Sequence, residues 1–232
     1  MASNFIRYEQ YTPRRRKIQC QIEATAYLSA VPDFGNIVTV FRVTAILFYA
    51  FCLLCVACQH ADRQNRELLR AVQGVDEKAT LLALTKGADP NATFRGNETA
   101  LGHLLLPYKR SHEERRRRIE RLATHLLELG ANPDAMHHGF TPLQIAAGQE
   151  SEILVTQLLA HGADPNLTAR HAYPPLWQAV FDNNARIGHL LLQAGANPNA
   201  PGPGGLRPLS YLRLQGQQKS RLLRILCRYG AL

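Results

Sequence analysis

The residues that could carry catalysis lack the partners that catalysis needs. His112-Glu113-Glu114 begins like the zinc-protease motif His-Glu-x-x-His, but Arg116 occupies the position of its second histidine. The chain also contains no Gly-rich phosphate loop and no Gly-x-Ser-x-Gly turn around a nucleophilic serine. The sequence therefore predicts a protein that is not an enzyme, with no catalytic residue and no cofactor.

Two adjacent histidines are the strongest candidates for metal ligands. His137 and His138 would need further His, Cys or carboxylate ligands that converge on the same ion. Neighbouring side chains in a loop point apart, and no third ligand is indicated. We therefore expect no metal site, and we expect both histidines to be solvated loop residues that can touch a partner.

A run of four arginines, Arg115–Arg118, could bind phosphate. Ser111 and Glu114 have the spacing of a capping box just before it. Apolar residues then follow at helical spacing: Ile119, Leu122, Ala123, Leu126 and Leu127. The run is expected to form the solvated face at the start of an amphipathic helix, and phosphate binding is the alternative.

A short sequence motif, called the recurring phrase below, repeats through the second half of the chain. The structure that it specifies must position the histidines and the arginine run. The copies of the phrase are Gly87–Asn91, Gly130–Asp134, Gly162–Asn166, Gly195–Asn199 and a shortened Tyr229–Leu232. Successive glycines are 43, 32, 33 and 35 residues apart. Each glycine follows an apolar helical run and can end it in the left-handed conformation, and a proline three residues later prevents the helix from continuing. The spacing predicts an all-α solenoid of about five helix-turn-helix repeats.

A second recurring motif begins a short helix before each later copy of the glycine-containing phrase. Its best copy is Thr141-Pro142-Leu143-Gln144, and with the period it resembles the Thr-Pro-Leu-His signature of the ankyrin-repeat family over roughly residues 63–232. The family histidine is replaced by Gly102, Gln144, Trp177 and Ser210. The resemblance implies that this histidine's hydrogen bonding is absent and that the array is less stable than a consensus one.

The repeat with the 43-residue spacing is about ten residues longer than its neighbours. The excess falls between its two helices, at residues 107–118, which we call the insertion. Insertions in repeat arrays map to one face of the solenoid, and this is often a binding face.

The resemblance also implies a binding surface, because partners of ankyrin arrays usually meet the loop tips and the exposed side of the first helix. Carried over residue by residue, the candidates are Phe94, Arg95, His137, His138, Phe140, Gln149, Arg170, His171, Tyr173, Trp177, Phe181 and Asp182. Aromatic residues and arginine are the types that dominate interface energy. For Trp177, filling the core at the vacant histidine position is an equal alternative.

The front of the chain divides into a polar, basic extension (residues 1–36) and an apolar segment (residues 37–58) before the repeat domain (residues 59–232). Val43–Cys58 is an uncharged run of 16 residues, whereas a membrane-spanning helix needs about 20. The run ends in Ala57-Cys58, which resembles a bacterial lipoprotein signal with Cys58 as the lipidated residue, although Cys55 stands where leucine is usual. A one-pass transmembrane anchor is the alternative, and with a processed leader translation would begin at Val38 or Val40.

Charge and family analogy narrow the expected function. The net charge is +9, and residues 58–232 keep +6, which favours acidic partners or an anionic membrane surface. Basic and aromatic residues do not alternate as the binding of single-stranded nucleic acid requires.

We expect a membrane-anchored module of the bacterial cell envelope, with its repeats in the periplasm. Envelope ankyrin proteins resemble immunity proteins that neutralise antibacterial phospholipase effectors; a membrane-anchored scaffold or a chaperone-like partner of an envelope enzyme is the alternative.

Overall fold

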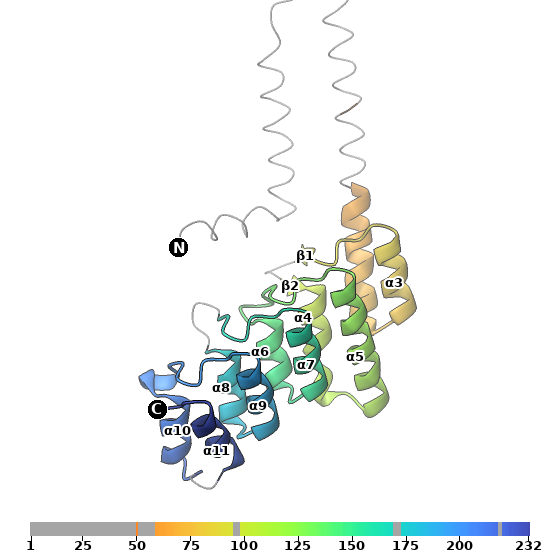
Figure 1. Cartoon of the computed structure of the whole chain (residues 1–232). Helices are drawn as coiled ribbons and strands as arrows, with labels where there is room; N and C mark the ends of the chain where they lie inside the picture. Colours follow the sequence, from red (N-terminus) through yellow and green to blue (C-terminus); the bar gives the residue numbers. More distant parts are fainter. Residues whose placement is uncertain (1–49, 51–58, 95–97, 169–172, 218–219) are drawn as a thin grey trace, which may run out of the picture.

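The computed structural model describes residues 50, 59–94, 98–168, 173–217 and 220–232. In these residues the helices form five successive pairs, and Figure 1 shows the pairs stacked side by side along the array. The pairs are residues 59–74 with α3 (Glu77–Thr85), α4 (Ala100–Leu105) with α5 (Glu113–Glu128), α6 (Pro142–Gly148) with α7 (Glu152–Ala160), α8 (Pro175–Phe181) with α9 (Ala185–Gln193), and α10 (Pro208–Leu214) with α11 (Arg221–Arg228). The predicted helical repeat array is confirmed.

The helices form two layers with the core between them. First helices α4, α6, α8 and α10 contact one another in sequence, and second helices α5, α7, α9 and α11 do the same. Leu104, Leu122, Leu154, Leu176 and Leu191 are each at most 1% exposed between the layers. Apolar burial therefore runs along the whole array instead of gathering at one centre, as repeat proteins require.

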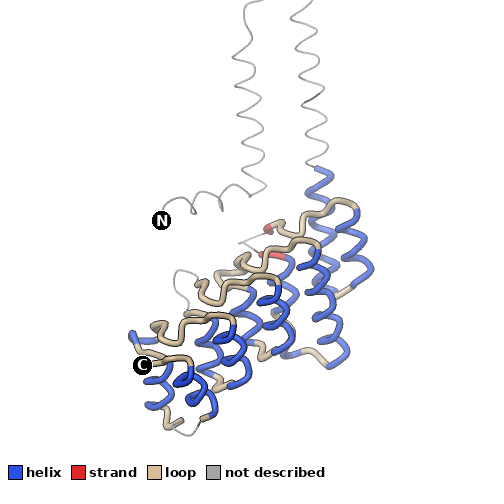
Figure 2. The backbone as a smooth tube through the Cα atoms, viewed as in Figure 1, coloured by secondary structure: helices blue, strands red, loops and turns tan. Residues whose placement is uncertain are grey.

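The loops between pairs project from one side of the stack (Figure 2). Two of them carry local strand pairing: β1 (Thr93–Phe94) pairs antiparallel with β2 (Glu98–Thr99), and His137 forms a single bridge with Phe140. Two short 3₁₀ helices, η2 (Tyr108–Arg110) and η3 (Pro203–Gly205), lie in longer connections.

The recurring glycine ends each second helix as the sequence predicts. At Gly130 φ is +89°, and the N–H of Ala131 donates to the carbonyl of Leu126 at 2.8 Å. Glycine adopts this left-handed conformation without the steric cost of a Cβ atom. The same positive φ recurs at Gly87, Gly162 and Gly195.

Helix starts follow the sequence except at the arginine run. Thr141 caps α6 and forms a capping box with Gln144. The capping box predicted for Ser111 and Glu114 is wrong. Ser111 Oγ instead donates to the carbonyl of Pro107 at 2.8 Å, and α5 begins one residue later, after His112.

The expected loss of hydrogen bonding at the family histidine position does not occur at Gln144 and Trp177, and next to Gly102 a residue of the following repeat supplies the bond. Gln144 Nε2 donates to the carbonyl of Tyr173, and Trp177 Nε1 donates to the carbonyl of Ala200 at 3.0 Å. Beside Gly102 the imidazole of His137 enters from the following repeat. These side chains bond α4, α6 and α8 to the loop that follows each pair.

Asparagines near the loop tips link neighbouring loops. Asn166 Nδ2 donates to the carbonyl of Gly195 at 2.9 Å, and its Oδ1 accepts the N–H of Asn197 at 2.8 Å. Asn91 and Asn199 make the same two bonds in their own repeats. The polar residues of the recurring phrase therefore join repeats laterally, in addition to shaping a turn.

The predicted anchor segment, residues 37–58 with Cys58, lies outside the described residues apart from Ala50. Within the part that is described, no helix combines the length and the apolar character needed to cross a membrane.

Candidate functional site

The structure divides the predicted partner-binding residues by exposure. His138, Phe140, Tyr173, Phe181 and Asp182 are exposed, whereas Phe94 and Gln149 are half-buried. Arg95, Arg170 and His171 lie outside the described residues. The exposed residues come from the loops and from the ends of first helices, so these five side chains are accessible to a partner.

Two predicted contact residues must be removed from that surface. His137 is 1% exposed and Trp177 is 0% exposed. Their rings fill space between repeats and bond to neighbouring backbone, so neither can touch a partner in this fold. For Trp177 the core-filling alternative holds.

Trp177 supports a cluster of aromatic rings at the surface. Its ring centroid lies 6.0 Å from that of Tyr173, 5.4 Å from that of Phe181 and 5.4 Å from that of Tyr211. Tyr173 and Phe181 are 41% and 40% exposed, and Tyr211 is half-buried. We call Tyr173, Phe181 and Tyr211 the aromatic patch.

Two further contacts within the patch close the cluster. Phe181 lies 5.6 Å from Tyr211 and 6.0 Å from Tyr173, measured between ring centroids, and both pairs have an edge-to-face geometry. Such pairs add about 0.5–1.5 kcal/mol beyond area burial. The exposed rings are therefore held in place before any partner arrives.

A close packing contact fixes the buried base of the patch. The six-membered ring of Trp177 lies against the backbone of Gly202, where any Cβ atom would overlap it. The indole N–H is bonded to Ala200, so ring position and orientation are both set. The loop after α9 therefore fixes Trp177, the buried residue on which the aromatic patch packs.

Tyr211 belongs to the patch but was not among the predicted residues. It follows Arg207-Pro208-Leu209-Ser210 in the first helix of the last repeat. The rule used for the other repeats, the exposed side of the first helix, applies equally there. The position of Tyr211 in its repeat is therefore the sequence signal that identifies it.

Phe140 forms a separate exposed aromatic at a loop tip. The N–H of His137 donates to the carbonyl of Phe140 at 2.8 Å, and the N–H of Phe140 donates back at 3.0 Å. Gly139 and His138 both take positive φ to close this turn. Phe140 is 48% exposed on a loop that backbone bonds hold firmly.

The histidines near this loop do not assemble a metal site. In the described ranges, no group of three or more His, Cys, Asp or Glu side chains converges. Burial, followed by the neighbouring His138 and His103, lowers the pKa of His137 to about 4, and Glu98 opposes this shift. A neutral His137 suits its role as acceptor for the N–H of Thr99, at 3.0 Å from Nδ1.

The fold and the recurring phrases define a class of protein, and comparison with known proteins agrees. Residues 115–202 match the family model for ankyrin repeats in 3 copies. The chain therefore contains ankyrin repeats, which are generally non-catalytic modules that bind other proteins.

Three relatives match part of this chain. Ankyrin repeat and MYND domain-containing protein 1 of Homo sapiens is 29% identical over 120 residues, 43% of this chain and 13% of that protein. A putative ankyrin repeat-containing protein of Treponema pallidum (strain Nichols) is 33% identical over 94 residues, 40% of this chain and 31% of that protein. Alpha-latrocrustotoxin-Lt1a of Latrodectus tredecimguttatus is 31% identical over 109 residues, 46% of this chain and 7% of that protein. The chain thus matches less than a third of each relative's length.

Proposed function

We propose that the chain binds a partner protein through the aromatic patch and the loop tip at Phe140, and that it acts by covering the partner's surface. The observation that carries this proposal is the pair Tyr173 and Phe181, each about two-fifths exposed on a base that is fully buried. Fixed aromatic side chains lose little freedom on binding, and they supply most of the energy of typical interfaces.

The finer parts of the proposal rest on the sequence and on family resemblance. We propose that Cys58 is lipidated, that the repeats stand in the periplasm, and that the partner is an antibacterial effector such as a phospholipase. In that role the chain is an immunity protein. Occlusion requires no catalytic group of its own, which agrees with the absence of a catalytic motif in the sequence.

The binding surface is tested by capturing a partner with the full chain and measuring its affinity for variants. Phe140→Ala and Tyr173→Ala are each expected to weaken binding by about 1–3 kcal/mol. Phe140→Ala should leave the melting temperature unchanged, whereas Tyr173→Ala should lower it slightly because its ring contacts with Trp177 and Phe181 are lost. Ile153→Ala is the matched control, because Ile153 is a similarly exposed apolar residue (51%) on the second helix α7. Equal affinity for all three variants would exclude the proposed surface.

The envelope part of the proposal is tested separately. Cys58→Ser is expected to shift the chain from the membrane fraction to the soluble periplasmic fraction and to remove the mass of the lipid. An unchanged distribution, together with an intact N-terminal segment in the mature chain, would contradict lipidation.

A further inference from the structure

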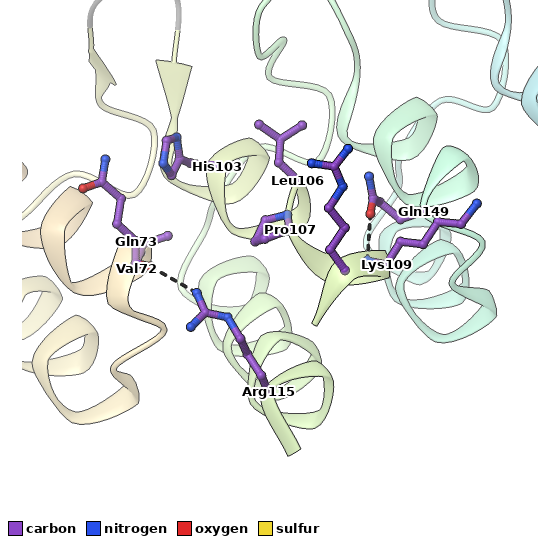
Figure 3. Close-up of a pocket in the computed structure, with 9 residues that line it drawn as sticks. Val72, Gln73, His103, Leu106, Pro107, Lys109, Arg115 and Gln149 are labelled. Atoms are coloured by element: carbon purple, nitrogen blue, oxygen red, sulfur yellow. Dashed lines mark hydrogen bonds between the residues drawn. The ribbon is translucent and has the colours of Figure 1, made fainter. Parts of the chain in front are cut away.

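The insertion builds one wall of a groove that is separate from the aromatic patch. The groove has a volume of about 590 Å³ and lies between the helix of residues 59–74, the end of α4, the insertion and the end of α6. Figure 3 shows Arg115 and Lys109 on two sides of it, with Leu106 and Pro107 between them. Ligand sites in proteins commonly have volumes of about 300–1,000 Å³.

Hydrogen bonds hold the insertion in a fixed conformation. Arg116 Nη2 donates to the carbonyl of Lys109 at 2.8 Å, and the backbone N–H of Lys109 donates to Gln149 Oε1, also at 2.8 Å. The Arg116 guanidinium lies over the ring of Tyr108, 5.5 Å from its centroid, and the Tyr108 hydroxyl bonds to Glu120. The wall therefore exists before a ligand binds, which lowers the ordering cost of binding.

The groove is positively charged. Lys109, Arg110 and Arg115 line it, and none of the described lining residues carries a carboxylate. Arg115 reaches the backbone carbonyl of Gln73 at 3.4 Å. Neither Arg115 nor Arg110 forms an ion pair with any residue in the described ranges. Lys109 pairs with Glu150 at 2.6 Å outside the lining.

The two neighbouring arginines of the run behave differently. Arg117 and Arg118 are exposed and form ion pairs with Glu113 and Glu114, four residues earlier on α5. The solvated helical face predicted for the arginine run therefore holds for these two. Arg115 is half-buried and turns toward the groove instead (Figure 3).

The groove also has an apolar part. Leu106 and Pro107 lie between the cations (Figure 3), and Leu106 is 43% exposed. Phosphate groups alone would gain nothing from these side chains. Single-stranded nucleic acid would need aromatic faces for its bases, and the lining residues include none of Phe, Tyr or Trp.

We propose that this groove is a second binding site and that it takes an acidic segment of a partner protein. The segment places carboxylates against Arg110 and Arg115 and an apolar side chain against Leu106. Charge complementarity selects the segment and speeds its association, and the apolar contact supplies affinity. The site rests on the proposed function only in that its occupant is a protein; it does not depend on the aromatic patch or on envelope anchoring.

The test uses the purified full chain and a fluorescein-labelled peptide of alternating Glu and Leu, with binding measured by fluorescence anisotropy. Arg110→Glu with Arg115→Glu is expected to weaken binding at least tenfold, about 1.4 kcal/mol. Arg117→Glu with Arg118→Glu makes the same change of net charge on exposed residues outside the groove, and it should weaken binding less than about threefold. Equal losses in both double variants would overturn the proposal, because only net charge would then matter.

Arg115→Glu could also disturb folding, because Arg115 bonds to the carbonyl of Gln73. A second pair of variants therefore tests the groove without changing Arg115. Leu106→Asp is expected to abolish peptide binding, whereas Leu214→Asp, at a residue that is 72% exposed on α10, should leave it unchanged. Circular dichroism checks that each variant is folded.

Preference for a Gln–Leu peptide, an oligonucleotide or phosphatidylglycerol vesicles over the Glu–Leu peptide would overturn the assignment of an acidic segment. Tyr173→Ala should bind the peptide normally, which separates this site from the patch.

Discussion

The imidazole of His137 occupies the space next to Gly102 that a Cβ atom on that glycine would fill. The two residues belong to neighbouring repeats, and Thr99, the cap of α4, donates its N–H to the imidazole. A side chain missing from one first helix is thus replaced by one from the next loop. The repeat junction keeps a buried hydrogen bond although the family histidine is absent from this position.

Gly102→Ala is expected to destabilise the chain by about 1–3 kcal/mol, because the new methyl group would overlap Cβ and Cγ of His137, whose ring is held in place by a hydrogen bond. Gly148→Ala is the control, since a Cβ there would lie 3.7 Å from Gln178, an ordinary contact. It should leave stability unchanged or raise it by up to about 1 kcal/mol. Urea unfolding followed by circular dichroism measures both, and equal unfolding midpoints would contradict the packing described.

Asp134→Asn is expected to stabilise the array by about 0.5–1.5 kcal/mol at pH 7. Asp134 stands where Asn91, Asn166 and Asn199 stand in their repeats, and it accepts the N–H of Asp164 at 3.0 Å. An ionised carboxylate cannot donate to the next glycine carbonyl as those asparagines do.

The stabilisation by Asp134→Asn should depend on pH. Burial raises the pKa of Asp134; the N–H of Asp164 lowers it, and the carboxylate of Asp164 raises it again. An acid whose pKa is raised on folding costs stability when it is ionised, so this cost disappears as pH falls through its folded pKa. The advantage of the variant should therefore shrink in acid. The reciprocal Asn166→Asp should destabilise at pH 7, and a stabilising effect there would contradict the role of the asparagines.

His137 should make stability depend on pH in a defined window. Its pKa is lowered on folding from the ordinary value of 6.5 to about 4, with burial as the main cause. The unfolded chain then binds a proton before the folded one does. The contribution is complete above pH 6.5 and is lost as pH falls toward about 4.

His137→Gln removes this titration and keeps an acceptor for Thr99. Urea midpoints between pH 7.5 and 4.5 should fall more steeply for the natural chain than for the variant. Parallel curves would show that His137 does not titrate as its surroundings require.

The repeat architecture could be predicted from the sequence because each helix end depends on local residues. Gly130 and Pro133 set a turn whatever lies around them, and Thr141 caps a helix with a residue three positions away. The apolar spacing of Leu122 and Leu126 likewise depends only on their own helix. Turns, caps and apolar spacing of this kind recur along the chain, so the sequence alone predicts the repeat length.

The candidate site could be predicted only in part, because burial depends on neighbouring repeats. Trp177 is buried since Gly202, 25 residues later, leaves room for its ring. His137 is buried because Gly102, 35 residues earlier, lacks a side chain. Arg115 leaves the solvated face of α5 because the carbonyl of Gln73 in the preceding repeat lies within reach. No single repeat contains these pairs, so residue type and spacing within a repeat could not reveal them.

Hydrogen–deuterium exchange with and without a captured partner tests the central claim most directly, because it shows where the partner lies on the array. The account predicts added protection in peptides covering Tyr173–Phe181 and Tyr211, and in the loop at Phe140. Peptides from the second helices α7 and α9 should exchange at the same rate in both states. Protection confined to those second helices, with no change at the aromatic patch, would contradict the claim that the chain binds its partner through these aromatic residues.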